Sequence, residues 1–221
     1  MIEKILRNIR FPDSEHSDNM YASETTYCLR KLYYKRTGIP STHSIETEIN
    51  FTQGNALHSL FEDLIIKKAP DFGYRAYNEV RLNVNNIHGV IDVVLINSEE
   101  INIIELKTVL KLPDNPFKNH STQLMIYMYP YIEYQEKHNK KVRGYLYYVE
   151  KAVLYGNSPQ KEFEVKYDKV VIEKVFERTK LLNYSLEKNI LPPAEALLKK
   201  EYWECNWCPY LKKCREDDGK W

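Results

Sequence analysis

The sequence predicts an α/β protein, because strand patterns and helix patterns both recur along the chain. Two β-branched runs within residues 89–107 flank a polar turn at 97–100, which is the pattern of a β-hairpin. Apolar residues at spacings of three and four predict long helices over residues 45–68 and 167–188. The 221 residues suffice for a sizeable core, and no clean boundary divides them, so residues 1–221 are predicted to form a single domain.

Shorter segments supply the remaining elements. Strand patterns cover residues 74–84, 142–149 and part of 150–167. Helix patterns cover residues 24–37, capped by Thr25 or Thr26 and closed by Gly38, and residues 119–137, capped by Asn119 or Ser121. Pro130 is expected to kink the second of these helices or to end its first half. Residues 110–117 contain two prolines and are predicted to form a loop.

Charged residues interrupt the apolar runs of the hairpin at Asp92, Glu105 and Lys107. If the turn is centred between Ser98 and Glu99, Asp92 lies directly opposite Glu105. Strand alternation then places Lys107 on the same face as Glu105. The hairpin is apolar on both faces, which is typical of a central, covered strand pair. Buried charges are costly unless they are paired or bind a metal, so these residues predict a functional site.

Two carboxylates on adjacent strands are suitable ligands for Mg²⁺ or Mn²⁺. Such an ion lowers the pKa of bound water and screens the charge of a phosphate. Lys107, two residues after Glu105, can orient the water or stabilise the transition state. The alternative is an ordinary Glu–Lys pair on an exposed edge strand, since Glu-x-Lys triplets are common. Asp92 on the facing strand favours the metal site over that alternative.

Composition limits the possible environments of the protein. The formal net charge is +1, so binding of nucleic acid would need a local basic patch. The helix predicted over 24–37 is basic and contains Tyr33 and Tyr34, and it suits either a phosphate contact or a solvated face. No apolar run approaches the ~20 residues that span a bilayer, and residues 1–7 lack the apolar core of a signal peptide. We therefore expect a cytoplasmic protein with no membrane partner.

The four cysteines predict a metal or cluster site. Three of them form the pattern Cys205-x₂-Cys208-x₅-Cys214, and Cys28 is the only other cysteine. Four thiolates complete a 4Fe–4S cluster or a tetrahedral zinc site, and the spacing alone does not decide between them. Such a site would join the two ends of the chain and stabilise the fold. The alternative, four unrelated buried thiols, is less favoured because cytoplasmic cysteines in this spacing are usually ligands.

Taken together, these motifs resemble the PD-(D/E)xK nuclease superfamily. The resemblance is greatest to RecB-like nucleases with a C-terminal iron–sulphur cluster, which include CRISPR-associated exonucleases and archaeal viral nucleases. The matching segments are Cys28-Leu-Arg-Lys-Leu-Tyr-Tyr, Gly54-Asn-Ala-Leu-His58, Gly89-Val-Ile-Asp92, Glu105-Leu-Lys107, Gln123-Leu-Met-Ile-Tyr127 and Cys205-x₂-Cys208-x-Tyr210-x₃-Cys214. Several are weak individually, but they occur in the expected order. Ile91 occupies the position of the proline in the PD-(D/E)xK motif, and many members of the superfamily lack that proline.

The resemblance implies a restriction-endonuclease-like mixed β-sheet flanked by helices. It assigns a Mg or Mn ion to His58, Asp92, Glu105 and the backbone carbonyl of Leu106. Lys107 would orient and activate the attacking water, while Gln123 and Tyr127 would hold Lys107 or the DNA phosphate. Glu62, one turn after His58, is outside the motif and is expected at most to support a ligand.

The implied activity is metal-dependent hydrolysis of DNA, preferentially single-stranded. The implied enzyme is an exonuclease, with endonuclease cleavage as a possible second activity. Cys28 and residues 200–221 would form an iron–sulphur subdomain. A CRISPR adaptation integrase complex, within antiviral defence, is an implied partner alongside DNA. The alternative from another class is a cluster-bearing DNA-binding adaptor subunit with a vestigial nuclease centre. The intact His58, Asp92, Glu105 and Lys107 argue against that alternative.

Overall fold

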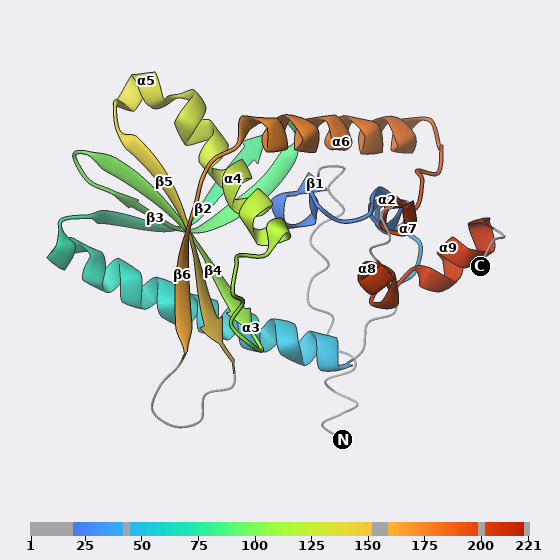
Figure 1. Cartoon of the computed structure of the whole chain (residues 1–221), viewed down its shortest axis with the longest axis horizontal. Helices are drawn as coiled ribbons and strands as arrows, with labels where there is room; N and C mark the ends of the chain where they lie inside the picture. Colours follow the sequence, from blue (N-terminus) through green and yellow to red (C-terminus); the bar gives the residue numbers. More distant parts are fainter. Residues whose placement is uncertain (1–19, 42–44, 152–158, 199–201, 219–221) are drawn as a thin grey trace.

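The computed structural model describes residues 20–41, 45–151, 159–198 and 202–218, with one six-stranded mixed sheet (Figure 1). The strands are β1 Met20–Tyr21, β2 Arg75–Val84, β3 Ile87–Ile96, β4 Glu100–Val109, β5 Lys141–Glu150 and β6 Gln160–Val165. The helices are η1 Ala22–Glu24, α2 Leu29–Arg36, α3 Ile45–Lys68, η2 Ala69–Phe72, α4 Lys118–Glu133, α5 Gln135–His138, α6 Lys169–Glu187, α7 Glu195–Leu198, α8 Tyr202–Asn206 and α9 Leu211–Asp218.

Strand β3 lies at the centre of the sheet and has three partners. Antiparallel β2 runs along one edge from Ile87 to Ile96. The other edge is divided, because antiparallel β4 pairs only with residues 93–96 and parallel β1 pairs with residues 87–88. Strand β4 continues parallel to β5, and β5 pairs antiparallel with β6. The predicted central position of the hairpin is therefore confirmed, and its two strands part halfway along β3.

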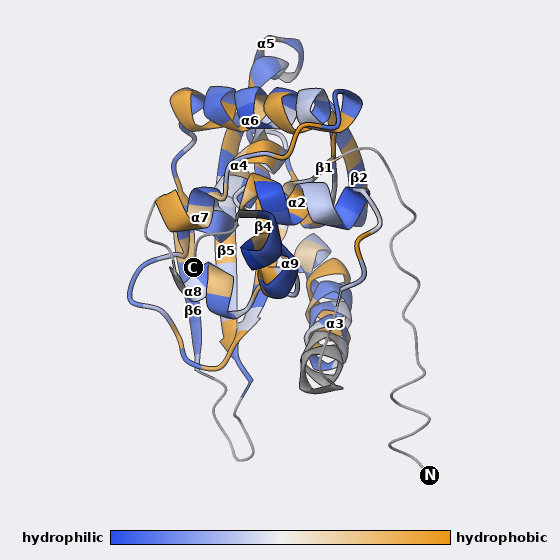
Figure 2. Ribbon diagram, turned by 90° about the vertical axis from the view of Figure 1, so that its right-hand side faces the viewer, coloured by the Kyte–Doolittle hydropathy of each residue, from blue (hydrophilic) through white to orange (hydrophobic). Residues whose placement is uncertain are grey.

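Helices flank this sheet. Helix α4 packs on β4 and β5 and contacts α6, which in turn contacts α2, whereas α3 crosses β2, β3 and β4. Figures 1 and 2 show α6 and α3 on opposite sides of the sheet. Apolar residues of the strands and of α4 and α6 form the core, whereas the short C-terminal helix α9 is hydrophilic (Figure 2). No helix in the described part of the chain is both long enough and apolar enough to cross a bilayer.

Several predicted boundaries need correction. Helix α2 begins at Leu29 rather than near Glu24, because the hydroxyl of Thr25 bonds to the carbonyl of Ala22 and does not cap the helix. The N-cap position of helix α4 is Phe117, which makes no side-chain capping hydrogen bond, rather than Asn119 or Ser121, and the helix continues past Pro130 to Glu133. A proline in the last turn removes only one backbone donor, which explains why the helix does not end there. The sequence does not predict strand β1, because a strand of two residues is too short to show an alternating pattern.

Candidate active site

The hairpin strands β3 and β4 part at Asp92 and Glu105. Regular antiparallel pairing extends from the turn to Val93 and Ile104, which confirms the predicted register. One further step would pair Asp92 with Glu105, but the regular pairing ends before it. Instead, the Leu106 N–H donates a 2.6 Å hydrogen bond to Asp92 Oδ2. The carboxylate of Asp92 therefore spans the opening between the two strands.

The opposite edge of β3 is irregular at the same level. The β2–β3 register is regular on both sides of Glu79 but skips the step that would join Glu79 to Asp92. Glu79 has a φ of 49°, a left-handed conformation that is uncommon for residues other than glycine. Strain of this kind persists only where the surrounding structure holds it, and it clusters at functional sites. The charge of Glu79 also acts to raise the pKa of Asp92.

Glu105 is held by two side chains and keeps one free oxygen. Lys107 Nζ and Gln123 Nε2 donate to Glu105 Oε1 at 2.6 and 2.8 Å. Gln123 Nε2 also donates to the hydroxyl of Tyr127 at 2.8 Å. Glu105 is 2% exposed, and its Oε2 has no hydrogen-bond partner in the described part of the chain. A buried carboxylate oxygen without a donor is a suitable place for a cation.

Glycine at position 89 allows Tyr127 to reach this site. A Cβ atom at Gly89 would lie 2.5 Å from Tyr127 Cε1 and 3.3 Å from Ala22 Cβ. Helix α4 can therefore approach β3 closely enough for Tyr127, which is 3% exposed, to contact Gln123. The resemblance matched Gly89 as part of a motif, and the structure supplies a steric reason for it.

Helix α3 brings His58 and Glu62 to the same opening. Ligand atoms of His58, Glu62 and Asp92 all lie within 4.8 Å of one another. His58 Nδ1 is 3.8 Å from Asp92 Oδ2. Glu62, expected to lie outside the ligand set, belongs to this group, whereas the carboxylate of Glu105 does not. The helical spacing of four residues, which puts His58 and Glu62 on one face, was the available signal.

The pKa values reflect burial of these groups. Burial raises the pKa of Glu105 to about 8, although Lys107 opposes the rise. Burial likewise raises the pKa of Asp92 to about 6, against the effects of Lys107 and the Leu106 N–H. Burial lowers the pKa of His58 to about 4, so its imidazole is neutral, which is the form that binds metals. Burial acts to lower the pKa of Lys107, but the Glu105 and Asp92 carboxylates outweigh it and raise that pKa.

These groups fit a divalent cation. The carboxylates resist ionisation because their burial is not fully compensated, and a bound cation would compensate it. Carboxylate oxygens and a neutral imidazole nitrogen are ligand types that Mn²⁺ accepts, and Mg²⁺ accepts the oxygens. The backbone carbonyl of Leu106 stays a predicted ligand, since the structure assigns a contact only to its N–H.

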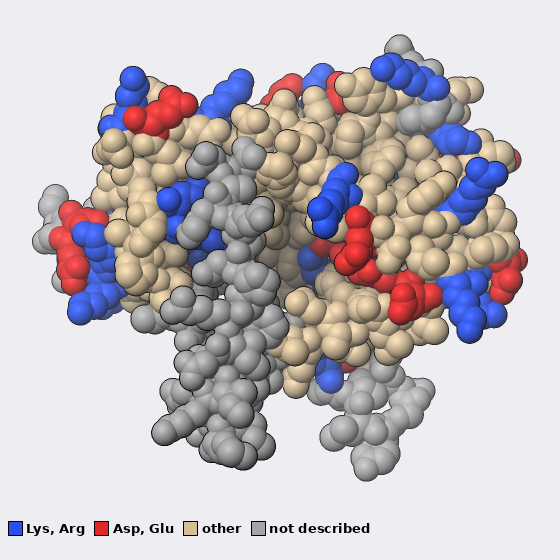
Figure 3. All heavy atoms as spheres, turned by 180° about the vertical axis from the view of Figure 1, so that it is seen from behind, with Lys and Arg blue, Asp and Glu red and all other residues tan. Residues whose placement is uncertain are grey.

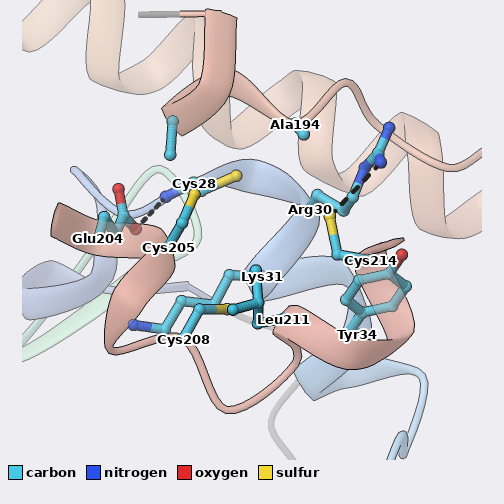
Figure 4. Close-up of a pocket in the computed structure, with 11 residues that line it drawn as sticks. Cys28, Arg30, Lys31, Tyr34, Ala194, Glu204, Cys205, Cys208, Leu211 and Cys214 are labelled. Carbon is cyan, nitrogen blue, oxygen red and sulfur yellow. Dashed lines mark hydrogen bonds between the residues drawn. The ribbon is translucent and has the colours of Figure 1, made fainter. Parts of the chain in front are cut away.

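The four cysteines lie in one cavity between α2 and the C-terminal helices (Figure 4). Hydrogen bonds join the two ends of the chain there: Cys28 N–H donates to Glu204 Oε1 at 2.8 Å, and Arg30 Nη1 donates to Cys214 Sγ at 3.6 Å. The thiols are free and are not at cluster geometry. No three of their sulphur atoms lie within 4.8 Å of one another, as they would around a single bound ion. The predicted proximity of the cysteines is therefore found, but a four-cysteine linkage is not.

The sequence profile of the PD-(D/E)XK nuclease superfamily matches residues 67–215, more than half of the chain. The chain belongs to the PD-(D/E)XK nuclease superfamily. The predicted superfamily is therefore confirmed, and its members are hydrolytic nucleases that use divalent metals. The matched residues include Asp92, Glu105 and Lys107 but begin after His58 and Glu62. Comparison with the curated proteins gives no match.

Several solved structures are similar to this chain. SSO0001 is 20% identical with a TM-score of 0.53, covering 95% of this chain and 94% of that chain. LHK-Exo in complex with dAMP is 14% identical with a TM-score of 0.49, covering 84% of this chain and 94% of that chain. LHK-Exo, an alkaline exonuclease from Laribacter hongkongensis, gives 13% identity and a TM-score of 0.49 in a further structure, covering 83% and 93%. At these identities the first comparison supports the fold alone.

Proposed function

We propose that this protein is a divalent-metal-dependent DNA nuclease that acts preferentially on single-stranded ends. One observation carries the proposal: the strands part at Asp92 and Glu105, and Glu105 keeps a buried oxygen without a partner. A half-buried Lys107 lies beside that carboxylate, with its Nζ 2.6 Å from Oε1. Carboxylates and a lysine in this arrangement suit phosphodiester hydrolysis, where negative charge develops on the phosphate.

The residues divide into three roles. Asp92, Glu105, His58 and Glu62 would hold the metal, which when bound supplies Lewis acidity at the phosphate. Lys107 would orient the attacking water and stabilise the developing charge. Gln123 and Tyr127 would fix the position of Glu105, because Gln123 Nε2 donates to Glu105 Oε1 and to the hydroxyl of Tyr127.

An end-labelled single-strand cleavage assay tests this proposal. We expect cleavage in Mg²⁺ or Mn²⁺ and none in a chelator. Asp92→Ala and Lys107→Ala should each lower the rate by at least about 100-fold, the typical loss when transition-state stabilisation is removed. The matched controls are Asp71→Ala and Lys68→Ala, which break an exposed pair at 3.1 Å and should cleave normally. Wild-type rates in either site variant would show that the assigned site is wrong.

The same assay separates the adaptor alternative and defines the activity. DNA binding without cleavage under any divalent metal would favour a binding subunit with a vestigial centre. Label position and product lengths report polarity and the balance of exonuclease and endonuclease action. No comparison supports a CRISPR integrase complex or a role in antiviral defence, so the proposal is limited to the nuclease.

We also propose that Cys28 and the three C-terminal cysteines bind a 4Fe–4S cluster, forming a subdomain with residues 200–221, of which the structure describes 202–218. Four thiols around one cavity and the Arg30 donor to Cys214 support a thiolate site. A single zinc ion would need all four sulphur atoms about 3.8 Å apart, given Zn–S bonds of about 2.3 Å, whereas no three of them lie within 4.8 Å of one another. Broad absorbance near ~400 nm in anaerobically purified protein is expected. A colourless protein with stoichiometric zinc would contradict the cluster.

A further inference from the structure

An open cavity of about 850 Å³ lies where the start of α4, helix α6 and helix α8 meet. Its volume falls within the range of ligand sites, about 300–1,000 Å³. It is separate from the carboxylate group, since none of His58, Asp92 and Glu105 lines it. We call this cavity the α4–α6–α8 groove.

The groove adjoins Lys107 through Tyr148. Tyr148 is the β5 residue paired with Lys107 in the parallel register. Its hydroxyl lies 2.8 Å from His120 Nδ1 and accepts a 3.2 Å hydrogen bond from the Phe117 N–H. His120 and Phe117 both line the groove. Thr122, which directly precedes Gln123 in α4, lines it as well. The groove lining is therefore connected to the proposed cleavage site through β5 and α4.

The groove is positively charged. Lys118, Lys174 and Arg178 line it. Arg178 is engaged by Glu195 and by the carbonyl of Tyr27, whereas Lys118 and Lys174 are exposed and make no ion pair with the residues that the structure describes.

The carboxylate in the groove lining is already engaged. Glu204 is buried and accepts a hydrogen bond from the Cys28 N–H. The groove therefore has cationic groups available for a polyanion. This local charge matters because basic and acidic residues are interspersed over the surface, as Figure 3 shows for the reverse face.

Two aromatic side chains of the groove are exposed. Trp203 in α8 is 64% exposed, and Phe117 at the start of α4 is 45% exposed. An exposed tryptophan beside lysines suits a strand of unpaired nucleotides, because bases stack on aromatic rings while lysines neutralise the backbone. Trp207, one turn further along the chain, is 84% exposed but does not line the groove.

We propose that the α4–α6–α8 groove binds the unpaired nucleotides that lead to the cleavage site, with bases on Trp203 and Phe117 and phosphates at Lys118 and Lys174. This proposal rests on the proposed nuclease function, because the link from the groove to Lys107 through Tyr148 is what makes a DNA strand the expected occupant. It names the substrate contacts that confer preference for single strands, since base pairing would keep the base faces from the rings.

Binding of a fluorescent single-stranded oligonucleotide by the full chain, in a chelator so that no cleavage occurs, tests the groove. Trp203→Ala should weaken binding by about 10-fold, the effect of losing one base–aromatic stack. Trp203→Phe should restore most of that affinity. Trp207→Ala is the matched control and should bind as wild type. Abasic positions in the oligonucleotide should weaken binding by wild type more than binding by Trp203→Ala, because the variant has already lost one of the two stacking rings.

The lysines have a separate signature. The Lys118→Ala, Lys174→Ala double variant should reduce the slope of log affinity against log salt by about 1.4, since each single-strand phosphate contact contributes about 0.7. Equal affinities for Trp203→Ala and Trp207→Ala, or an unchanged salt slope, would overturn the proposal. A change of oligomeric state in Trp203→Ala without loss of oligonucleotide binding would instead mark the groove as a contact between copies.

The two proposals fail in distinguishable ways. If oligonucleotide binding depends on Trp203 but no metal supports cleavage, the groove stands and the nuclease assignment falls. If cleavage depends on Asp92 and Lys107 but neither binding nor KM changes in the groove variants, the nuclease stands and the groove proposal falls.

Discussion

Two buried glutamates, Glu24 and Glu105, meet a lysine at the same distance but in different surroundings. The Nζ of Lys35 lies 2.6 Å from Glu24 Oε1, and the Nζ of Lys107 lies 2.6 Å from Glu105 Oε1. Glu24 Oε2 also pairs with Arg36 at 3.0 Å and accepts from the Tyr21 N–H. Glu105 Oε2 has no partner in the described residues.

The pKa values of the two glutamates move in opposite directions. Burial acts to raise the pKa of Glu24, but Lys35 and Arg36 outweigh it and lower the pKa. Burial raises the pKa of Glu105 to about 8, and the nearby Asp92 carboxylate adds to the rise. A glutamate with every oxygen paired is structural, whereas one held in place with an oxygen unpaired is prepared for a ligand.

The rate of DNA cleavage should show the largest difference between variants of the two glutamates. Glu105→Gln should lower the cleavage rate by at least about 100-fold, because the carboxylate that would hold the metal loses its charge. Glu24→Gln should cleave at nearly the wild-type rate at a temperature where it is folded. Steady-state rates of cleavage, with circular dichroism as the folding control, measure the difference. Equal losses in the two variants would contradict the functional assignment of Glu105.

The stability of the metal-free protein should depend on pH in opposite ways through the two sites. The pKa of Glu105 is raised in the folded state, so its contribution is present below the unfolded value of about 4.5 and is lost as pH rises through about 8. The pKa of Glu24 is lowered, so its contribution is present above about 4.5 and is lost as pH falls through its lower folded value.

Chemical denaturation from acid to alkaline pH measures these contributions. Glu105→Gln should remove a loss of a few kcal/mol between about pH 4.5 and 8, since one pKa unit corresponds to about 1.4 kcal/mol. Glu24→Gln should leave that loss in place and weaken stability mainly above pH 4.5. If both variants flatten the same part of the curve, the contrast between the two glutamates does not hold.

Divalent metal should stabilise the protein through one site only. At a concentration about 100 times Kd, Mn²⁺ should raise the free energy of unfolding by about 2.7 kcal/mol in wild type. The same increase is expected in Glu24→Gln, and a much smaller one in Asp92→Ala. Thermal unfolding with and without Mn²⁺ gives the comparison, and equal stabilisation of Asp92→Ala would place the metal elsewhere.

The smallest effect is expected at Gln123. Gln123→Ala removes the amide that holds Glu105 Oε1 and should weaken Mn²⁺ binding by about 10-fold, as supporting hydrogen bonds of metal ligands typically do. Calorimetric titration with Mn²⁺ measures the Kd. The control is Gln160→Ala, an exposed glutamine that pairs with Tyr147 and should not change the Kd.

The hairpin register was predictable from the sequence, because strand alternation and the turn leave few alternatives. The step at which the strands part was not, since it depends on the Asp92–Leu106 hydrogen bond and on the left-handed backbone of Glu79. Glu62 was discounted for lack of a motif, although its spacing from His58 was visible. Four cysteines in this pattern predicted that they would gather around one site, as they do around one cavity. The distances between their sulphur atoms could not be predicted.

The amino-acid sequence by itself determined the α/β class, the central hairpin and the order of motifs that place the chain in the PD-(D/E)XK superfamily. Periodicity and turn chemistry are local properties, so they can be read from neighbouring residues. Only the tertiary structure decided that Glu62 joins His58 and Asp92, that Glu105 keeps an unpaired oxygen and that Trp203 lines a groove with the residues at the start of α4. These features arise where α3, α4 and α8 pack around the sheet, and long-range packing leaves no periodic trace in the sequence.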